Sequence, residues 1–193
     1  NDRSQHKNRA AAMSMLIMPK GTLFICDTFV NAGPTAEQIA RYTVLAAEAI
    51  RHFGIQPRAA LLSHSNFGSS LASTARKMRE AVEMIREMDP DLLVDGEMHA
   101  DAALSEAMRE PLIGDGVLKG SANLLIMPSL DAANISYNMV RMLADGVDVG
   151  PILLGMDLPC HVLHETINAR GIVDMTALAV VEAQGTVKQE LLL

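Results

Sequence analysis

Aromatic side chains are nearly absent from this chain of 193 residues: they make up 3% of it, and tryptophan does not occur. A core of normal density must therefore be built from aliphatic side chains and from the 13 methionines. Cysteine is also scarce, and Cys26 and Cys160 both lie in apolar runs. Two such cysteines form no disulfide framework, so we expect inert buried thiols and a reducing, cytoplasmic location.

Positive charge is in deficit as well. Sixteen lysines and arginines stand against 23 aspartates and glutamates, which gives a net charge of −7. Because an acidic chain is poorly suited to nucleic-acid backbones and anionic membrane surfaces, we expect neither as a partner. No apolar run approaches the roughly 20 residues that span a bilayer, and residues 1–9 are too polar for a signal peptide. The composition, 49% apolar and 20% charged, excludes a disordered chain.

Apolar runs alternate with helix-like segments along the chain. The runs at 13–18 and 22–26 flank a Pro-Lys-Gly turn and predict a hairpin. Further strands are expected at 58–62, 92–95, 123–127, 149–154 and 160–163, and helices at 34–53, 72–88, 100–108, 132–143 and 171–183. This alternation predicts an α/β fold with a mostly parallel sheet flanked by helices.

Polar loops follow several of the predicted strands, at the edge where parallel sheets bind their ligands. The most suggestive loop runs from Ser63 to Ser70, where small hydroxyl side chains and a glycine precede a helix. Such a loop either presents backbone N–H groups to an anion or caps the helix, and the residues alone favour neither interpretation. His64, within this loop, is either a ligand-binding group or a surface histidine.

Two carboxylates, Asp95 and Glu97, flank a glycine at the end of another predicted strand. Paired carboxylates perform acid–base chemistry or hold a metal ion. We favour the simpler interpretation, in which Asp95 caps the next helix and Glu97 pairs with an arginine. His161 and His164 are three residues apart but have no third ligand near them in the sequence, so we expect no metal site.

Six segments in chain order resemble motifs of the phosphotransacetylase family, the phosphate acetyl- and butyryltransferases. Residues 61–69, L-L-S-H-S-N-F-G-S, resemble L-L-S-x-S-x-x-G-S, and residues 90–98, P-D-L-L-V-D-G-E-M, resemble P-D-L-x-x-D-G-E-[LM]. The other four resemble x-D-T-x-V-N at 26–31, G-x-A-N-x-x-I-x-P at 120–128, N-I-x-Y at 134–137 and G-P-I-x-x-G at 150–155.

The resemblance implies the C-terminal part of a two-lobed α/β fold that is similar to isocitrate dehydrogenase. Residues 13–187 would belong to this domain, with an unassigned polar segment at 1–12 and a tail at 188–193. The chain begins at asparagine and not at methionine, so we expect it to be a piece of a longer protein. The matched loops supply the ligand-facing residues that the resemblance implies: Ser63, Ser65, Asn66, Phe67, Gly68, Ser69, Asp95, Glu97, Asn123, Asn134 and Asp157.

The family transfers acyl groups between coenzyme A and phosphate, but this chain departs from its pattern. A Ser-Arg pair and a later Asp of the family are replaced by His164, Glu165 and Gly171, and a lysine often found in the serine loop is replaced by Phe67. Two unit charges 4 Å apart interact by ~4 kcal/mol at an effective dielectric constant of ~20, so replacing a cation by a carboxylate opposes anion binding. We therefore expect no catalytic residues, and a site that still holds a CoA thioester.

Residues 171–181, G-I-V-D-M-T-A-L-A-V-V, resemble one subgroup, the C-terminal domains of the hybrid NADP-dependent malic enzymes of bacteria. This resemblance implies a regulatory domain that binds acetyl-CoA as an allosteric effector and forms homodimers or larger homo-oligomers. Oxidation of malate, with NADP and a divalent metal, would belong to a domain outside this chain, which has no cofactor of its own. The alternatives are an active phosphate acetyl/butyryltransferase with His164 as its base, and a dimerisation scaffold with an empty cleft.

Overall fold

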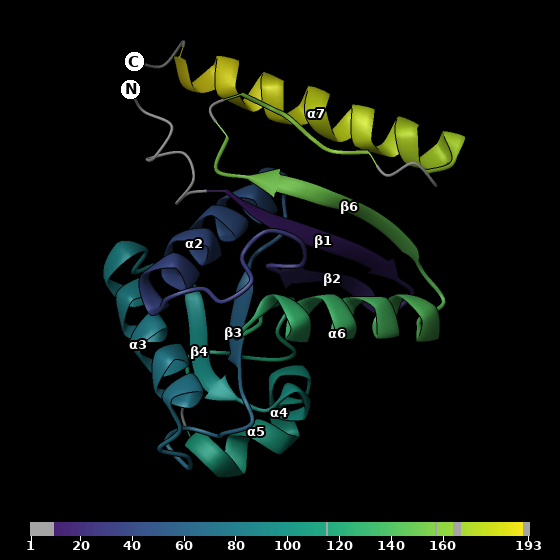
Figure 1. The fold of residues 1–193 in the computed structure, drawn as a ribbon. Helices are drawn as coiled ribbons and strands as arrows, with labels where there is room; N and C mark the ends of the chain where they lie inside the picture. Colours follow the sequence, from purple (N-terminus) through teal and green to yellow (C-terminus); the bar gives the residue numbers. More distant parts are fainter. Residues whose placement is uncertain (1–9, 115, 157, 164–166, 191–193) are drawn as a thin grey trace.

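The computed structural model of the chain describes residues 10–114, 116–156, 158–163 and 167–190 (Figure 1). Its centre is a six-stranded sheet with the strand order β4-β3-β5-β2-β1-β6. The strands are β1 (Ala11–Met18), β2 (Gly21–Cys26), β3 (Arg58–Leu62), β4 (Leu93–Met98), β5 (Leu124–Ile126) and β6 (Val147–Leu154). Within the described residues β1 alone runs against its neighbours, so the prediction of a mostly parallel α/β sheet is confirmed.

Helices cover both faces of this sheet. On one face lie α2 (Ala36–His52) and α3 (Ser73–Met88), and α7 (Ala169–Glu190) follows β6 (Figure 1). On the other face lie α4 (Ala100–Leu104), α5 (Glu106–Ile113) and α6 (Leu130–Leu143). Alternate strand residues supply the two cores: Phe24 and Cys26 belong to the first, and Leu23 and Ile25 to the second. The apolar strands are therefore buried on both faces, as parallel sheets require.

The start of α2 shows how local sequence fixes an element. Thr35 Oγ1 accepts the N–H of Gln38 at 3.2 Å, and Gln38 Oε1 accepts the N–H of Thr35 at 2.9 Å. This capping box satisfies N–H groups that the first helical turn leaves without partners. Within the described residues, no helix is both long enough and apolar enough to cross a membrane.

The structure corrects three expectations. Residues 160–163 are irregular and form no strand, and it is the ring of His161, through Nδ1, that accepts the N–H of Leu153 in β6. Cys160, which was expected to be buried, lies in this irregular segment and is exposed. The single helix expected at 100–108 is divided at Ser105, whose backbone is extended. The domain boundaries at 12–13 and 187–188 stay predictions.

A buried arginine lies in α5, just after Ser105, where the predicted helix is divided into α4 and α5. Arg109, in α5, is only 2% exposed, and its guanidinium donates to the carbonyl oxygens of Ala102 at 2.8 Å, Leu118 at 3.1 Å and Gly120 at 2.7 Å. One planar group thus ties the end of α4 to the loop that leads to β5. Hydrogen bonds from a charged donor to buried carbonyls are among the stronger ones in proteins.

We expect Arg109→Lys to lower the free energy of unfolding by about 2 kcal/mol, because an ammonium group cannot reach carbonyls on both sides as the guanidinium fork does. Urea unfolding measures this change. The matched control is Arg76→Lys on the exposed side of α3, which should change stability by less than about 0.5 kcal/mol. Equal unfolding midpoints for the two variants would contradict the structural role of Arg109.

Candidate functional site

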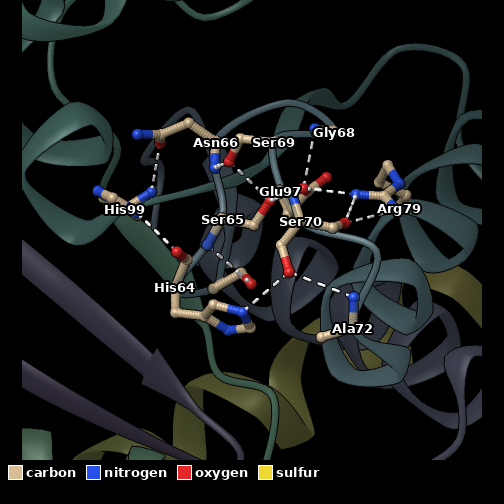
Figure 2. A network of polar contacts seen from close by, with 11 residues as sticks. His64, Ser65, Asn66, Gly68, Ser69, Ser70, Ala72, Arg79, Glu97 and His99 are labelled. Atoms are coloured by element: carbon tan, nitrogen blue, oxygen red, sulfur yellow. Dashed lines mark hydrogen bonds and ion pairs between the residues drawn. The ribbon is translucent and has the colours of Figure 1, made fainter.

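The loop from Ser63 to Ser70, here called the serine loop, meets the end of β4 at the carboxyl edge of the sheet. Because β3 and β4 are parallel neighbours, the residues that follow them emerge side by side. Ser63 N–H donates to the carbonyl of Met98 at 2.9 Å, and the loop then folds over the side chain of Glu97 (Figure 2). The Glu97 side chain is fully buried.

One carboxylate oxygen of Glu97 collects three donors. Its Oε1 accepts from the hydroxyl of Ser65 at 2.6 Å, from the N–H of Gly68 at 3.0 Å and from Nη1 of Arg79 at 2.7 Å (Figure 2). Burial by itself raises the pKa of Glu97, but these hydrogen bonds outweigh burial, so that the pKa lies below its usual value. The group is therefore an ionised, buried carboxylate paired with an arginine.

The hydroxyl groups of the loop form an ordered chain of hydrogen bonds. Since the proton of Ser65 goes to the carboxylate, Ser69 must donate to Ser65 in the 3.1 Å contact between their Oγ atoms. Ser69 Oγ in turn accepts the N–H of Asn66 at 3.0 Å, and Ser65 Oγ accepts the N–H of Ser70 at 3.0 Å. Each bond polarises the next, which makes the loop a rigid unit.

These contacts decide between the two interpretations of the serine loop. One backbone N–H of the loop, that of Gly68, does bind an anion, but that anion is the protein's own Glu97, and the N–H of Phe67 donates to the Glu97 backbone carbonyl. The loop does not act as a side-chain cap either, because the cap residue of α3 is Ala72, and its own N–H donates to Ser70 Oγ at 3.2 Å. The predicted pairing of Glu97 with an arginine is confirmed, and Arg79 is the partner.

Asp95 does not cap the next helix, so that part of the prediction is wrong. It also pairs with an arginine of α3, since its Oδ1 accepts from Arg86 Nη2 at 3.0 Å, and its Oδ2 accepts the N–H of Leu118 at 3.2 Å. Only glycine fits between the two carboxylates, because the neighbouring strand leaves no room for a Cβ atom. A Cβ on Gly96 would lie 2.8 Å from the carbonyl oxygen of Leu61 in the neighbouring strand.

Phe67 occupies the place where the family often has a lysine. Its backbone has a positive φ of 44°, a value that residues other than glycine rarely adopt. Its N–H donates to the backbone carbonyl of Glu97 at 2.7 Å. Its ring packs against the second core, the one beneath α4 and α6. The loop therefore presents an apolar ring where a cation would favour phosphate.

Three groups near the loop were missed by sequence reasoning. Arg79 reaches Glu97 from α3, and Lys77 of the same helix donates to the Pro128 carbonyl at 2.7 Å, where burial lowers the pKa of its ammonium. His99 binds the loop at two points, since its N–H donates to Asn66 Oδ1 at 2.8 Å and its Nε2 lies 2.9 Å from the carbonyl of His64 (Figure 2). No local pattern in the sequence places Arg79 beside Glu97, because the packing of α3 against β4 brings the two together.

The remaining predicted residues are not gathered at the serine loop. Asn123 lies at the opposite edge of the sheet, where its Oδ1 accepts the N–H of Arg58 at 2.7 Å. Asn134, in α6, donates to the carbonyl of Thr28 at 3.3 Å, next to the end of β2. Gly171 lies in the first turn of α7. The candidates that fall outside the described residues are Asp157, His164 and Glu165.

Asp27, like Glu97, is a buried carboxylate that accepts hydrogen bonds from the loop beside it. This carboxylate, 2% exposed at the end of β2, accepts the N–H groups of Ala12 at 3.0 Å, Phe29 at 3.1 Å and Asn31 at 2.8 Å. The x-D-T-x-V-N motif thus shapes the loop after β2. In the described part of the chain, no three His, Cys, Asp or Glu side chains gather closely enough to hold a metal ion.

A small cavity of about 290 Å³ lies between β6 and the start of α7. Gly171 lines it together with Asn168 and two arginines, Arg141 and Arg170. Each arginine faces an aspartate across a long ion pair, 3.7 Å to Asp148 for Arg141 and 3.9 Å to Asp174 for Arg170. Exposed pairs of this length contribute little to stability, so both guanidinium groups can turn toward another anion at small cost.

Comparison with known proteins gives a consistent result. Residues 3–180 match the family described as Phosphate acetyl/butaryl transferase. The NADP-dependent malic enzyme of Salmonella typhimurium is 56% identical over 92% of this chain, and the phosphate acetyltransferase of Thermoanaerobacterium thermosaccharolyticum is 37% identical over 85%. A phosphotransacetylase structure from Streptococcus pyogenes superposes with a TM-score of 0.85 at 31% identity over 93% of this chain. The chain spans 24%, 50% and 54% of these three proteins, respectively.

We expect Glu97→Gln to lower the free energy of unfolding by about 3 kcal/mol at neutral pH, since it leaves Arg79 without its buried counter-ion. The folded-state pKa of Glu97 is depressed, so the carboxylate's contribution is complete above the unfolded-state pKa of about 4.3 and disappears as pH falls through the lower folded-state value. Urea unfolding of both proteins over a range of acidic pH measures this.

The control is Glu83→Gln, which changes an exposed glutamate in an i,i+3 pair with Arg86. It should cost less than about 1 kcal/mol. A stability difference between the wild type and Glu97→Gln that stays constant down to the lowest pH would contradict the ionised state assigned to Glu97.

Proposed function

The chain belongs to the Phosphate acetyl/butaryl transferase family, and we propose that it is the regulatory and assembly domain of a malic enzyme. In this proposal the domain binds acetyl-CoA as an effector and transfers no acetyl group. Two sequence relationships support it. Identity is 56% to a malic enzyme and 37% to a phosphate acetyltransferase, and the chain is 24% of the malic enzyme's length, as one domain of that protein would be.

The observation that carries the loss of chemistry is Phe67. Transfer of an acetyl group to phosphate develops negative charge, which needs cations and N–H donors aimed at the reacting atoms. The N–H of Phe67 is taken by the backbone carbonyl of Glu97 and that of Gly68 by its carboxylate, while the half-buried ring of Phe67 packs against the second core. Glu165, in the stretch where the family has an arginine, adds a negative charge in the sequence.

The cavity beside Gly171 is where we propose that the effector's phosphate groups bind. Arg141 and Arg170 offer two guanidinium groups there, next to their partners Asp148 and Asp174, and the positive end of the 22-residue helix α7 lies at the same place. Phosphate is well matched to guanidinium in shape and charge. Malate oxidation, NADP and a divalent metal would belong to a domain outside this chain, and a cytoplasmic location would suit an enzyme of central metabolism with unpaired cysteines.

We expect the chain to bind acetyl-CoA saturably in isothermal titration and to form no acetyl phosphate from acetyl-CoA and phosphate. Arg170→Gln should weaken binding about tenfold, because it removes a charged hydrogen bond worth about 1.4 kcal/mol. The control is Arg41→Gln, which removes another exposed arginine of an i,i+4 ion pair and should leave binding unchanged.

The two possible failures have different meanings. If acetyl phosphate forms at the rate of an active family member, the chain is a transferase, and His164→Ala should then abolish turnover. If acetyl-CoA does not bind and no turnover occurs, the effector role is overturned and a scaffold function remains.

A further inference from the structure

Both arginines of the cavity beside Gly171 already face anionic partners inside the protein. Arg141, near the end of α6, faces Asp148 of β6. Arg170, in the first turn of α7, faces Asp174 one turn later. The end of α6, the start of β6 and the start of α7 lie on the same side of the molecule (Figure 1). All four charged side chains line this one cavity, so that two positive charges in it are matched by two negative ones.

Asp148 is held in position by a second group, the side chain of Tyr137 in α6. The Tyr137 hydroxyl donates to Asp148 Oδ2 at 3.4 Å, and Cζ of Arg141 lies 5.7 Å from the centre of the Tyr137 ring. Burial, and after it the negative charge of Asp148, raises the pKa of Tyr137, so the hydroxyl keeps the proton that it donates. One tyrosine therefore contacts both the arginine and the aspartate of this pair.

The two aspartates compete with any anion that enters the cavity. A carboxylate that is tethered beside its arginine acts at an effective concentration in the millimolar range. A dissolved carboxylate that took its place would only exchange one carboxylate for another, and the displaced aspartate would repel it. In a cavity of about 290 Å³ such charges lie within roughly one Debye length, about 8 Å at physiological ionic strength, so dissolved salt screens the repulsion only in part.

A phosphate group is a stronger competitor than a carboxylate. It carries about 1.5 to 2 negative charges at neutral pH and three acceptor oxygens. The planar fork of a guanidinium group binds two of those oxygens at once. The ion pairs that a phosphate must break are long and partly exposed, 3.7 Å for Arg141 and 3.9 Å for Arg170, so breaking them costs little.

We propose that Asp148 and Asp174 determine the specificity of this cavity, because they reserve its two arginines for phosphate groups and exclude carboxylates. The proposal rests on the proposed function, since it concerns the same effector site. The ligand class is an anion with two phosphate groups, one for each arginine that leaves its aspartate. The cavity has about the smallest volume of a ligand cleft, roughly 300 Å³, and so takes the phosphate-bearing end of a larger molecule.

The exclusion of carboxylates has a use in the protein that we propose. Malate, the substrate of a malic enzyme, is a dicarboxylate, and two arginines without partners would bind it as well as they bind an effector. With both aspartates in place, malate gains nothing by entering the cavity. The effector site then responds to the phosphorylated ligand alone, whatever the concentration of substrate.

Isothermal titration of the 193-residue chain with inorganic pyrophosphate, and separately with malate, tests the two aspartates. We expect the wild type to bind pyrophosphate and not to bind malate at millimolar concentration. Asp148→Asn and Asp174→Asn should each tighten pyrophosphate binding about fivefold, because two unit charges about 4 Å apart in water change a binding constant by about that factor. The variant with both substitutions should bind malate as well.

The matched control is Glu37→Gln, which removes the carboxylate of another exposed i,i+4 pair, the one with Arg41. It should bind both ligands like the wild type. Circular dichroism shows whether the variants fold. Pyrophosphate affinities that are equal in the wild type and both single variants, absence of pyrophosphate binding throughout, or a double variant that still does not bind malate would each overturn the role of the aspartates.

Titration of the same proteins with acetyl-CoA separates this proposal from the proposed function. If the aspartate variants bind pyrophosphate more tightly but no protein of the set binds acetyl-CoA, the effector role is overturned and the specificity of the cavity stands. If acetyl-CoA binds and Arg170→Gln weakens it, while the aspartate variants gain no affinity for either ligand, the effector role stands and the role of the aspartates is overturned.

Discussion

The carboxyl edge of the sheet depends on the buried carboxylate of Glu97. A carboxylate out of water costs several kcal/mol unless donors surround it, and here Ser65, the N–H of Gly68 and Arg79 converge on one of its oxygens. The serine loop takes its shape from this requirement, since the remaining hydroxyl and N–H groups of the loop bond to one another around it. Asp27 organises the loop after β2 in the same way. Two internal anions thus fix the loops that follow β2 and β3 at the carboxyl edge of the sheet.

Because these buried carboxylates have structural roles, the motifs that contain them identify the family without identifying the function. The motif residues Asp27, Glu97 and Asn123 each hold backbone N–H groups in place, so each has a structural role that does not depend on whether chemistry remains. Phe67 differs from them in that its backbone N–H, and not its side chain, binds Glu97. The contact with Glu97 therefore does not require a particular side chain at this position, although the ring that is present packs against the second core. Six matched motifs therefore establish the family and leave the activity open.

Much of the fold follows from local periodicity, and the exceptions have identifiable causes. The strands at 58–62 and 149–154 and the helices at 72–88 and 132–143 show clear patterns, and the structure has elements there. Local sequence patterns fail to predict the elements where a side chain, and not a backbone group, is the hydrogen-bond partner of the main chain. His161 replaces a strand partner for Leu153, and Arg109 binds the carbonyls at the end of α4 where the predicted helix is divided. The partners of Asp95 and Glu97 were equally out of reach, because Arg86 and Arg79 lie on α3, and only the packing of α3 against β4 brings them close.

The serine loop and the apolar groove between α4 and α6, which has Leu23, Leu62 and Leu125 as its floor, are joined through α4. A loop held only by water would change shape without consequence elsewhere. This loop is held by His99 at the start of α4, and α4 forms a wall of the apolar groove. Because His99 is bonded to Asn66 and to the His64 carbonyl, a displacement of α4 would also displace the loop. Packed elements and hydrogen bonds of this kind are what carries energetic coupling between surfaces of a protein.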